Sequence, residues 1–170
     1  VYTYTVSGTG PCPDASANVV VTEPQLPNAG FNSTVALCSN NQPVLMRMLL
    51  GGSPDPTGTW SGPSPTTGYY DPVTMSPGVY TYTVPGTAPC PNASATLTIS
   101  ETQAPSAGVG GLVEPCMGAA PFAMFDSLSG NPDLGGIWSN QAGTTSGTFD
   151  PGTSTEGVYT YTVLGVGPCP

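Results

Sequence analysis

The side chains of this sequence with the widest chemical range are its five cysteines, Cys12, Cys38, Cys90, Cys116 and Cys169. A thiol can form a disulfide, bind a metal or act as a nucleophile. Zinc is disfavoured, because the chain has no histidine and no Cys-x-x-Cys pair. Nucleophilic catalysis is disfavoured too, because neither histidine nor lysine is present to serve as the base. We therefore predict no catalytic residue and no enzymatic activity, and we expect disulfides in an oxidising compartment.

Carboxylates are the second group of candidates, and four of them recur beside a proline: Asp55, Asp71, Asp133 and Asp150. Aspartates in such places cap turns, which is the role we expect for them. Calcium bound at the ends of structural units is the sharper alternative, since carboxylates and carbonyls can converge there. The sequence has no Asp-x-Asp-x-Asp-Gly run to support it, and no other cofactor is predicted.

Two tripeptides match the glycosylation sequon, Asn32-Ser33-Thr34 and Asn92-Ala93-Ser94. Both fall where a surface turn is expected. Asn32 and Asn92 are therefore candidate acceptors of a glycan.

The charge of the chain excludes two classes of partner. One basic residue, Arg47, stands against ten acidic ones, for a formal net charge of −9. Nucleic acids and anionic lipids both require clusters of Lys and Arg. No run of about 18 apolar residues is present either, so no membrane insertion is expected. Charged residues make up only 6% of the chain, and the Thr, Ser, Gly and Pro that replace them are typical of short strands and tight turns in an extracellular protein.

The elements that must position these residues repeat along the chain. Val-Tyr-Thr-Tyr-Thr-Val occurs at 1–6, 79–84 and 158–163, with starting points 78 and then 79 residues apart. The cysteines and the two tryptophans, Trp60 and Trp138, recur at the same offset. Because solenoid repeats have periods of roughly 20–50 residues, each unit here is predicted to be a small domain with its own core.

The strands predicted in one unit are short and separated by regular turn signals, with about seven of them in each complete unit. This pattern predicts an all-β fold of tandem Ig-like antiparallel β-sandwich modules. In 79–84, the strand period of two places Tyr80, Tyr82 and Val84 on one face, which we expect to pack inward with the phenol groups reaching the sandwich edge. The apolar segment 44–50 is either a helical turn or a strand, and burial is predicted for it in both cases.

Three regions follow from the repeat. Residues 1–24 are predicted to be the last two strands of a preceding module, 27–102 a complete module, and 105–170 a module that lacks its last strand. The proline-containing segments 23–27 and 101–105 are expected to be joints that limit bending. Two interpretations stay open for the incomplete regions. Either a longer chain continues the array, or the strand at 16–22 completes the open module of a neighbouring copy.

Two disulfide schemes fit the repeat. One joins Cys12 to Cys38 and Cys90 to Cys116, and the other joins Cys38 to Cys90 and Cys116 to Cys169, leaving Cys12 with a partner outside the chain. In an Ig-like strand order, Cys38 and Cys90 lie at the same pole of one module, whereas Cys12 lies a module length away. Since bridged Cα atoms must approach within about 7 Å, the second scheme is favoured.

The run Gly-Val-Tyr-Thr-Tyr-Thr-Val-Pro-Gly-Thr-Ala-Pro-Cys-Pro-Asn-Ala-Ser-Ala-Thr-Leu-Thr-Ile at 78–99 resembles the PKD-like or Ig-like repeat modules of giant secreted surface proteins of gliding-type bacteria. Gly-Thr-Trp-Ser-Gly at 58–62 and Tyr-Asp-Pro at 70–72 match the same pattern. The resemblance implies export to the cell surface, a role in an adhesin stalk, filament or matrix, and no catalytic residues. The partner that we expect is the chain itself, end to end, as a longer chain or a filament.

A different class of function is the alternative. Tyr69 and the threonine-rich outer faces of the strands are candidate contacts for a carbohydrate or another surface ligand.

Overall fold

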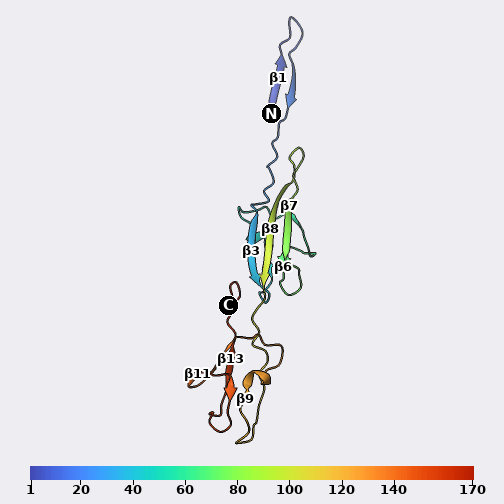
Figure 1. Ribbon diagram of the computed structural model, residues 1–170. Coiled ribbons are helices and arrows are strands. Elements are labelled where there is room, and N and C mark those ends of the chain that lie inside the picture. The colour runs from blue at the N-terminus through green and yellow to red at the C-terminus, as the bar shows by residue number, and fades with distance from the viewer.

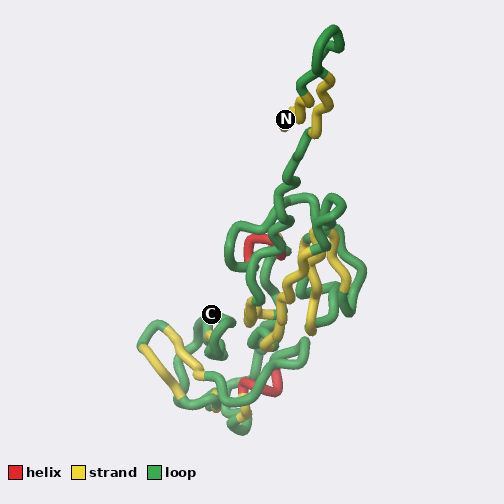
Figure 2. The backbone as a smooth tube through the Cα atoms, turned by 90° about the horizontal axis from the view of Figure 1, so that it is seen from above, coloured by secondary structure: helices red, strands yellow, loops and turns green.

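Short strands and proline- or glycine-rich turns build the whole chain, in which the computed structural model describes residues 1–170. Three regions lie in line along an elongated molecule (Figure 1). We call them the N-terminal hairpin (residues 1–22), the central unit (27–102) and the C-terminal unit (105–170). Most of the backbone lies in loops (Figure 2). The chain contains no α-helix, and the expected all-β class is confirmed.

The N-terminal hairpin consists of β1 (Tyr2–Val6) and β2 (Ala15–Val19), paired antiparallel. Its apolar side chains have nothing to pack against, and Tyr2, Tyr4 and Val19 are each more than 60% exposed, at 71%, 72% and 61%.

The central unit is built from two sheets. Strands β3 (Ser33–Cys38), β8 (Ala93–Thr102), β7 (Gly78–Val84) and β5 (Thr59–Ser61) form one sheet, in that order. Strands β4 (Val44–Leu45) and β6 (Tyr69–Tyr70) form the other. The strands pair antiparallel except at one edge, where β3 runs parallel to β8 and Cys38 lies opposite Thr102.

The core of the central unit lies between these sheets and contains eleven buried residues. Tyr80, Tyr82 and Val84 are at most 2% exposed, as the alternation in β7 predicts. Leu97 of β8 is completely buried beside them. The Tyr70 ring from the second sheet packs edge-on against Tyr80, with ring centroids 5.6 Å apart. Two facing sheets around one apolar layer form a β-sandwich.

The segment that was ambiguous in the sequence combines both predicted conformations. After β4, residues Met46–Leu49 form a 3-10 turn, η1, and the side chain of Met46 is completely buried. The C-terminal unit repeats this arrangement with β9 (Phe122–Ala123) and η2 (Met124–Ser127). The predicted burial is confirmed at Met46 and Leu50 but not at Met48, which is 71% exposed. Met124, the counterpart of Met46, is 6% exposed.

The C-terminal unit has a smaller framework. Strands β11 (Gly143–Thr145), β10 (Ile137–Asn140) and β13 (Thr160–Thr162) form one sheet, and β12 (Thr148–Phe149) pairs with β9. Its core contains three buried residues, Met124, Trp138 and Tyr161. No helix in the structure has the length and apolar character needed to span a membrane.

Candidate functional site at the junction of the two units

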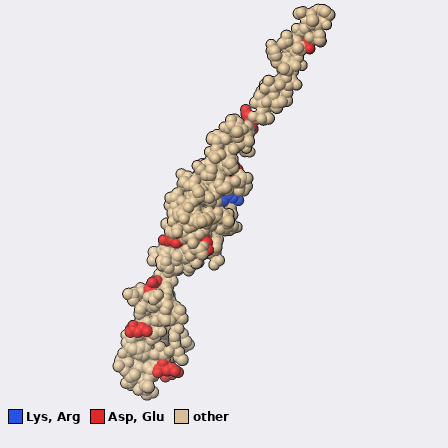
Figure 3. All heavy atoms as spheres, turned by 90° about the vertical axis from the view of Figure 1, so that its right-hand side faces the viewer, with Lys and Arg blue, Asp and Glu red and all other residues tan.

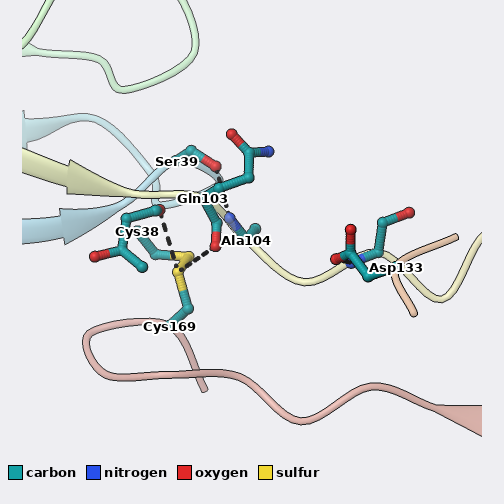
Figure 4. Close-up of a disulfide and its surroundings, with 8 residues drawn as sticks. Cys38, Ser39, Gln103, Ala104, Asp133 and Cys169 are labelled. Atoms are coloured by element: carbon teal, nitrogen blue, oxygen red, sulfur yellow. Dashed lines mark hydrogen bonds between the residues drawn. A yellow bond between two sulfur atoms is a disulfide. The ribbon is translucent and has the colours of Figure 1, made fainter. Parts of the chain in front are cut away.

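The central and C-terminal units are covalently joined where they meet. Cys38, the last residue of β3, forms a disulfide with Cys169, which follows β13 in the C-terminal unit. Their Cα atoms are 4.9 Å apart, and both residues are buried, at 0% and 4% exposed. Figure 4 shows this bond beside the linker that connects the units. The disulfide therefore closes the joint between two units, not a loop within one of them.

Hydrogen bonds attach the linker to the central unit next to this disulfide. The amide of Ser39 donates to the Thr102 carbonyl over 2.9 Å, and the Ser39 hydroxyl accepts from the amide of Ala104 over 2.9 Å. The Cys169 sulfur lies 3.4 Å from the Thr102 carbonyl oxygen. The first residues of the linker are therefore held on one side by β3 and on the other by the disulfide.

A second clamp lies directly after the linker and fixes the first residues of the C-terminal unit. The Asp133 carboxylate accepts from the amide of Ser106 over 2.8 Å, and the Asp133 amide donates back to the Ser106 carbonyl over 2.8 Å. The same pair of bonds joins Asp55 to Asn28 at the start of the central unit, again with both distances at 2.8 Å. Each unit therefore fixes its own first residues, directly after the linker that precedes it, so the joint lacks the freedom of an open tether.

The disulfide scheme favoured from the sequence is wrong in both of its pairs. Cys38 does not pair with Cys90, and Cys116 does not pair with Cys169. The reason is the direction of β3: because it runs parallel to β8, Cys38 lies at the end of β8, whereas Cys90 precedes its first residue, Ala93. Ten residues of extended strand, about 33 Å, separate the two cysteines, far beyond the reach of a disulfide.

Three cysteines are unpaired in the structure. Cys12 and Cys116 are exposed, and Cys90 is half-buried with its sulfur 3.7 Å from the Pro24 carbonyl oxygen. The alternative scheme, Cys12 with Cys38 and Cys90 with Cys116, is not formed either.

The predicted calcium candidates do not form a cluster, and two of them cap turns. The Asp71 carboxylate accepts from the Val73 amide and the Thr74 hydroxyl, over 3.0 and 2.9 Å. Asp150 accepts from the amide of Gly152 over 2.9 Å. Asp71 and Asp150 therefore have the turn-capping role expected of them, whereas Asp55 and Asp133 instead make long-range bonds to the amides of Asn28 and Ser106. The structure contains no group of three or more His, Cys, Asp or Glu residues able to hold a metal ion.

One titratable group near the junction has a shifted pKa. Burial of the Tyr70 phenol raises its pKa well above the usual value, and its hydrogen bond to the Glu101 carboxylate over 2.5 Å raises it further. Glu101 precedes Thr102, so the neutral phenol fastens the second sheet of the sandwich to the end of β8. The counterpart of Tyr70 in the C-terminal unit is Phe149, which has no hydroxyl to make this bond.

The other predicted surface sites are all exposed. Tyr69 is 54% exposed and borders a shallow hollow of about 340 Å³ with Pro65, Thr66, Thr67 and Met75. The carboxamide oxygens of both sequon asparagines accept backbone hydrogen bonds, Asn32 from Thr96 and Asn92 from Gly86. Glycosylation and carbohydrate binding stay predictions.

The sequence reasoning missed the polar residues of the junction, chiefly Ser39, Thr102 and Ser106. A signal for part of the site was present, because Asn28-Ala29-Gly30 recurs as Ser106-Ala107-Gly108 at the offset of the Pro-Asp pairs that clamp them. No such signal marks Thr102, whose role follows from the parallel pairing of β3 with β8.

Comparisons with family models, with curated proteins and with solved structures find no match to this chain.

Proposed function

We propose that this chain is part of an extracellular tandem array of Ig-like, PKD-like modules that serves as a stalk, filament or adhesin spacer. The observation that carries the proposal is the junction, where one disulfide joins successive units and hydrogen bonds fix the chain on both sides of the linker. A spacer must transmit length and resist bending. A joint closed covalently beside a clamped linker supplies both properties, because it removes the freedom of a single-chain tether.

The surface of the molecule supports the same proposal. Acidic residues are dispersed along its length and Arg47 is the single basic residue (Figure 3). Uniform negative charge keeps neighbouring rods apart and soluble. A disulfide that contributes to the structure requires an oxidising environment, so the proposed location is the cell surface or the extracellular space.

Small-angle scattering of the purified chain tests this proposal. The oxidised protein is expected to have the maximum dimension of a rod with its units in line, and the Cys38→Ser/Cys169→Ser variant to become shorter on average and more flexible. Cys12→Ser is the matched control, because Cys12 is exposed and unpaired. An oxidised chain that scatters as freely jointed beads contradicts the proposal.

The alternative is a module that binds a carbohydrate. The exposed Tyr69 ring beside a hollow lined by Thr66 and Thr67 favours it, since sugars stack on exposed aromatic rings and hydrogen-bond to hydroxyl groups. Screening on a glycan array, with Tyr69→Ala as the comparison, tests this function. Absence of signal, or equal binding by the variant, removes it.

A further inference from the structure

We propose that Cys90 and Cys116 each form a disulfide of the same kind as Cys38–Cys169, with a cysteine from a neighbouring unit of the repeat. Cys90 takes a cysteine placed like Cys38 in the unit that precedes it. Cys116 takes a cysteine placed like Cys169 in the unit that follows it. The inference rests on the proposed function, because it requires units in series, and it adds that every joint carries a disulfide.

Cys90 has the surroundings of Cys169, one repeat earlier. Its amide donates to the Thr87 carbonyl over 2.9 Å, as the Cys169 amide does to Val166 over 3.0 Å. Its sulfur lies 3.7 Å from the carbonyl oxygen of Pro24. Pro24 precedes Thr102 by the 78-residue offset, and the Thr102 carbonyl lies 3.4 Å from the Cys169 sulfur. The Cys90 thiol is thus placed against its linker as the bonded sulfur is.

Cys116 has the local geometry of Cys38, one repeat later. The carbonyl of Cys116 accepts from the amide of Ala119 over 3.0 Å, and that of Cys38 accepts from Asn41 over 3.0 Å. The two cysteines differ in what covers them: Cys38 is completely buried under the next unit, whereas Cys116 is exposed. Cys116 therefore presents a preformed turn with its thiol open to a partner.

Cys90 and Cys116 cannot complete each other within this chain. Cys90 contacts the linker that precedes the central unit, whereas Cys116 follows the linker at the other end of β8. Ten extended residues keep these ends about 33 Å apart. Each cysteine therefore requires a partner from another unit.

The chemistry of the proposed bond is ordinary thiol–disulfide exchange. One thiolate attacks oxidised glutathione, forms a mixed disulfide and releases one glutathione thiolate. The partner thiolate then attacks the protein sulfur of that mixed disulfide and releases the second. In total, two cysteine thiols lose two electrons and two protons, and one oxidised glutathione becomes two reduced molecules.

The repeat supplies an in-register test protein. Residues 158–170 match residues 1–13 at eleven of thirteen positions, so a tandem chain in which Asp14–Pro170 directly follows Pro170 continues the repeat. Cys116 of the first copy and Cys90 of the second are then 131 residues apart, the separation of Cys38 and Cys169. After refolding in a glutathione redox buffer and alkylation of free thiols, non-reducing peptide mapping is expected to find one Cys90–Cys116 linkage per tandem chain.

Paired variants identify which copies supply the bond. Cys116→Ser in the first copy is expected to abolish the linkage, whereas Cys116→Ser in the second copy leaves it intact. A tandem chain that forms Cys38–Cys169 but leaves every Cys90 and Cys116 alkylated overturns the inference. So does a linkage that survives Cys116→Ser in the first copy.

The single 170-residue chain distinguishes the source of the neighbouring unit. If it forms oligomers linked through Cys90 and Cys116, a second copy can serve as the neighbour; if it stays monomeric while the tandem chain forms the bond, the neighbour must lie in the same chain. Scattering separates this inference from the proposed function. A tandem chain that is rod-shaped without the linkage contradicts the inference alone.

Discussion

The central and C-terminal units are built from related sequences, yet they differ in the extent of their cores. The central unit buries eleven residues in one cluster and the C-terminal unit three. In the central unit, β8 lies between β3 and β7 and contributes Ala95, Leu97 and Ile99 to the core. In the C-terminal unit, β13 pairs only with β10, and no strand takes the place of β8.

The space left in the C-terminal unit is visible as a hollow. A cavity of about 790 Å³ lies between the segment 110–117 and aromatic residues that include Phe122, Trp138 and Phe149. Leu112 in that segment is 85% exposed, whereas the corresponding β3 is a regular strand that pairs with β8 along its length. Strand β8 therefore both fills the core and provides the pairing partner of β3, so the parallel edge that carries Cys38 depends on β8.

The largest effect is expected from the bond that joins the units. In Cys169→Ser, the C-terminal unit should lose on the order of 4 kcal/mol of unfolding free energy. With the central unit folded, the disulfide to Cys38 holds Cys169 beside Thr102, the last residue of β8, and so closes the C-terminal unit into a loop. Urea unfolding followed through Trp138, in a Trp60→Phe background, measures this loss. An equal loss in the central unit, monitored through Trp60, contradicts this view, as does an effect of Cys12→Ser.

Truncation of one buried β8 side chain should lower the unfolding free energy of the central unit. Leu97→Ala is expected to cost about 3 kcal/mol, because Leu97 is completely buried and its loss leaves a cavity. Val19→Ala at the equivalent position of the N-terminal hairpin is the matched control and should cost nearly nothing, since Val19 is 61% exposed. Thermal and urea unfolding of both variants check the pair; similar losses at the two positions would show that burial by β8 is not the cause.

The fourth residue of the repeated hexapeptide is tyrosine in all three regions, so the two units and the hairpin can be compared at one side chain. The Tyr82 hydroxyl donates to the Asp55 carbonyl and accepts from the Gly58 amide, and Tyr161 makes the same two bonds, to Asp133 and Gly136. Tyr82→Phe should cost about 2 kcal/mol, since it leaves two partly buried backbone groups unpaired. Tyr161→Phe should weaken the C-terminal unit.

The control for this prediction is Tyr4→Phe in the hairpin. Tyr4 has the same place in the repeated hexapeptide but is 72% exposed. No measurable change in unfolding free energy is expected. A loss equal to that of Tyr82→Phe would show that the two hydrogen bonds of the buried hydroxyl are not the cause.

The smallest expected effect is a difference between the two units in how their stability depends on pH. Burial of the Tyr70 phenol, with its bond to Glu101, raises its pKa above the usual value of 10.0, so folding favours the neutral form. That contribution is complete below pH 10 and is lost as the pH rises above 10 toward the folded-state pKa. The C-terminal unit has Phe149 there and lacks this pH-dependent contribution to stability. Urea midpoints from pH 8 to about 11 should fall less steeply for the central unit in Tyr70→Phe than in the parent; identical slopes contradict the assignment.

Much of the strand layout could be predicted from the sequence. The strand at 79–84 and its inward tyrosine face follow from the period of two. The turn caps at Asp71 and Asp150 follow from their proline neighbours, whereas the long-range bonds of Asp55 and Asp133 could not be predicted. The disulfide could not be predicted, because its choice depended on the direction of the strand at 34–38. A five- or six-residue strand reads the same in a parallel and an antiparallel pairing, and only its neighbours decide which end faces the next unit.

The sequence by itself therefore determined what is local or repeated: the spacing of the cysteines, the β class and the alternating faces. The tertiary structure decided which cysteines meet. Local side-chain periodicity fixes which face of a strand is apolar, but the pole at which its last residue lies depends on pairing between residues more than 60 positions apart, as between Cys38 and Thr102. For that reason two of the cysteines predicted to close each unit on itself, Cys38 and Cys169, instead bond one unit to the next.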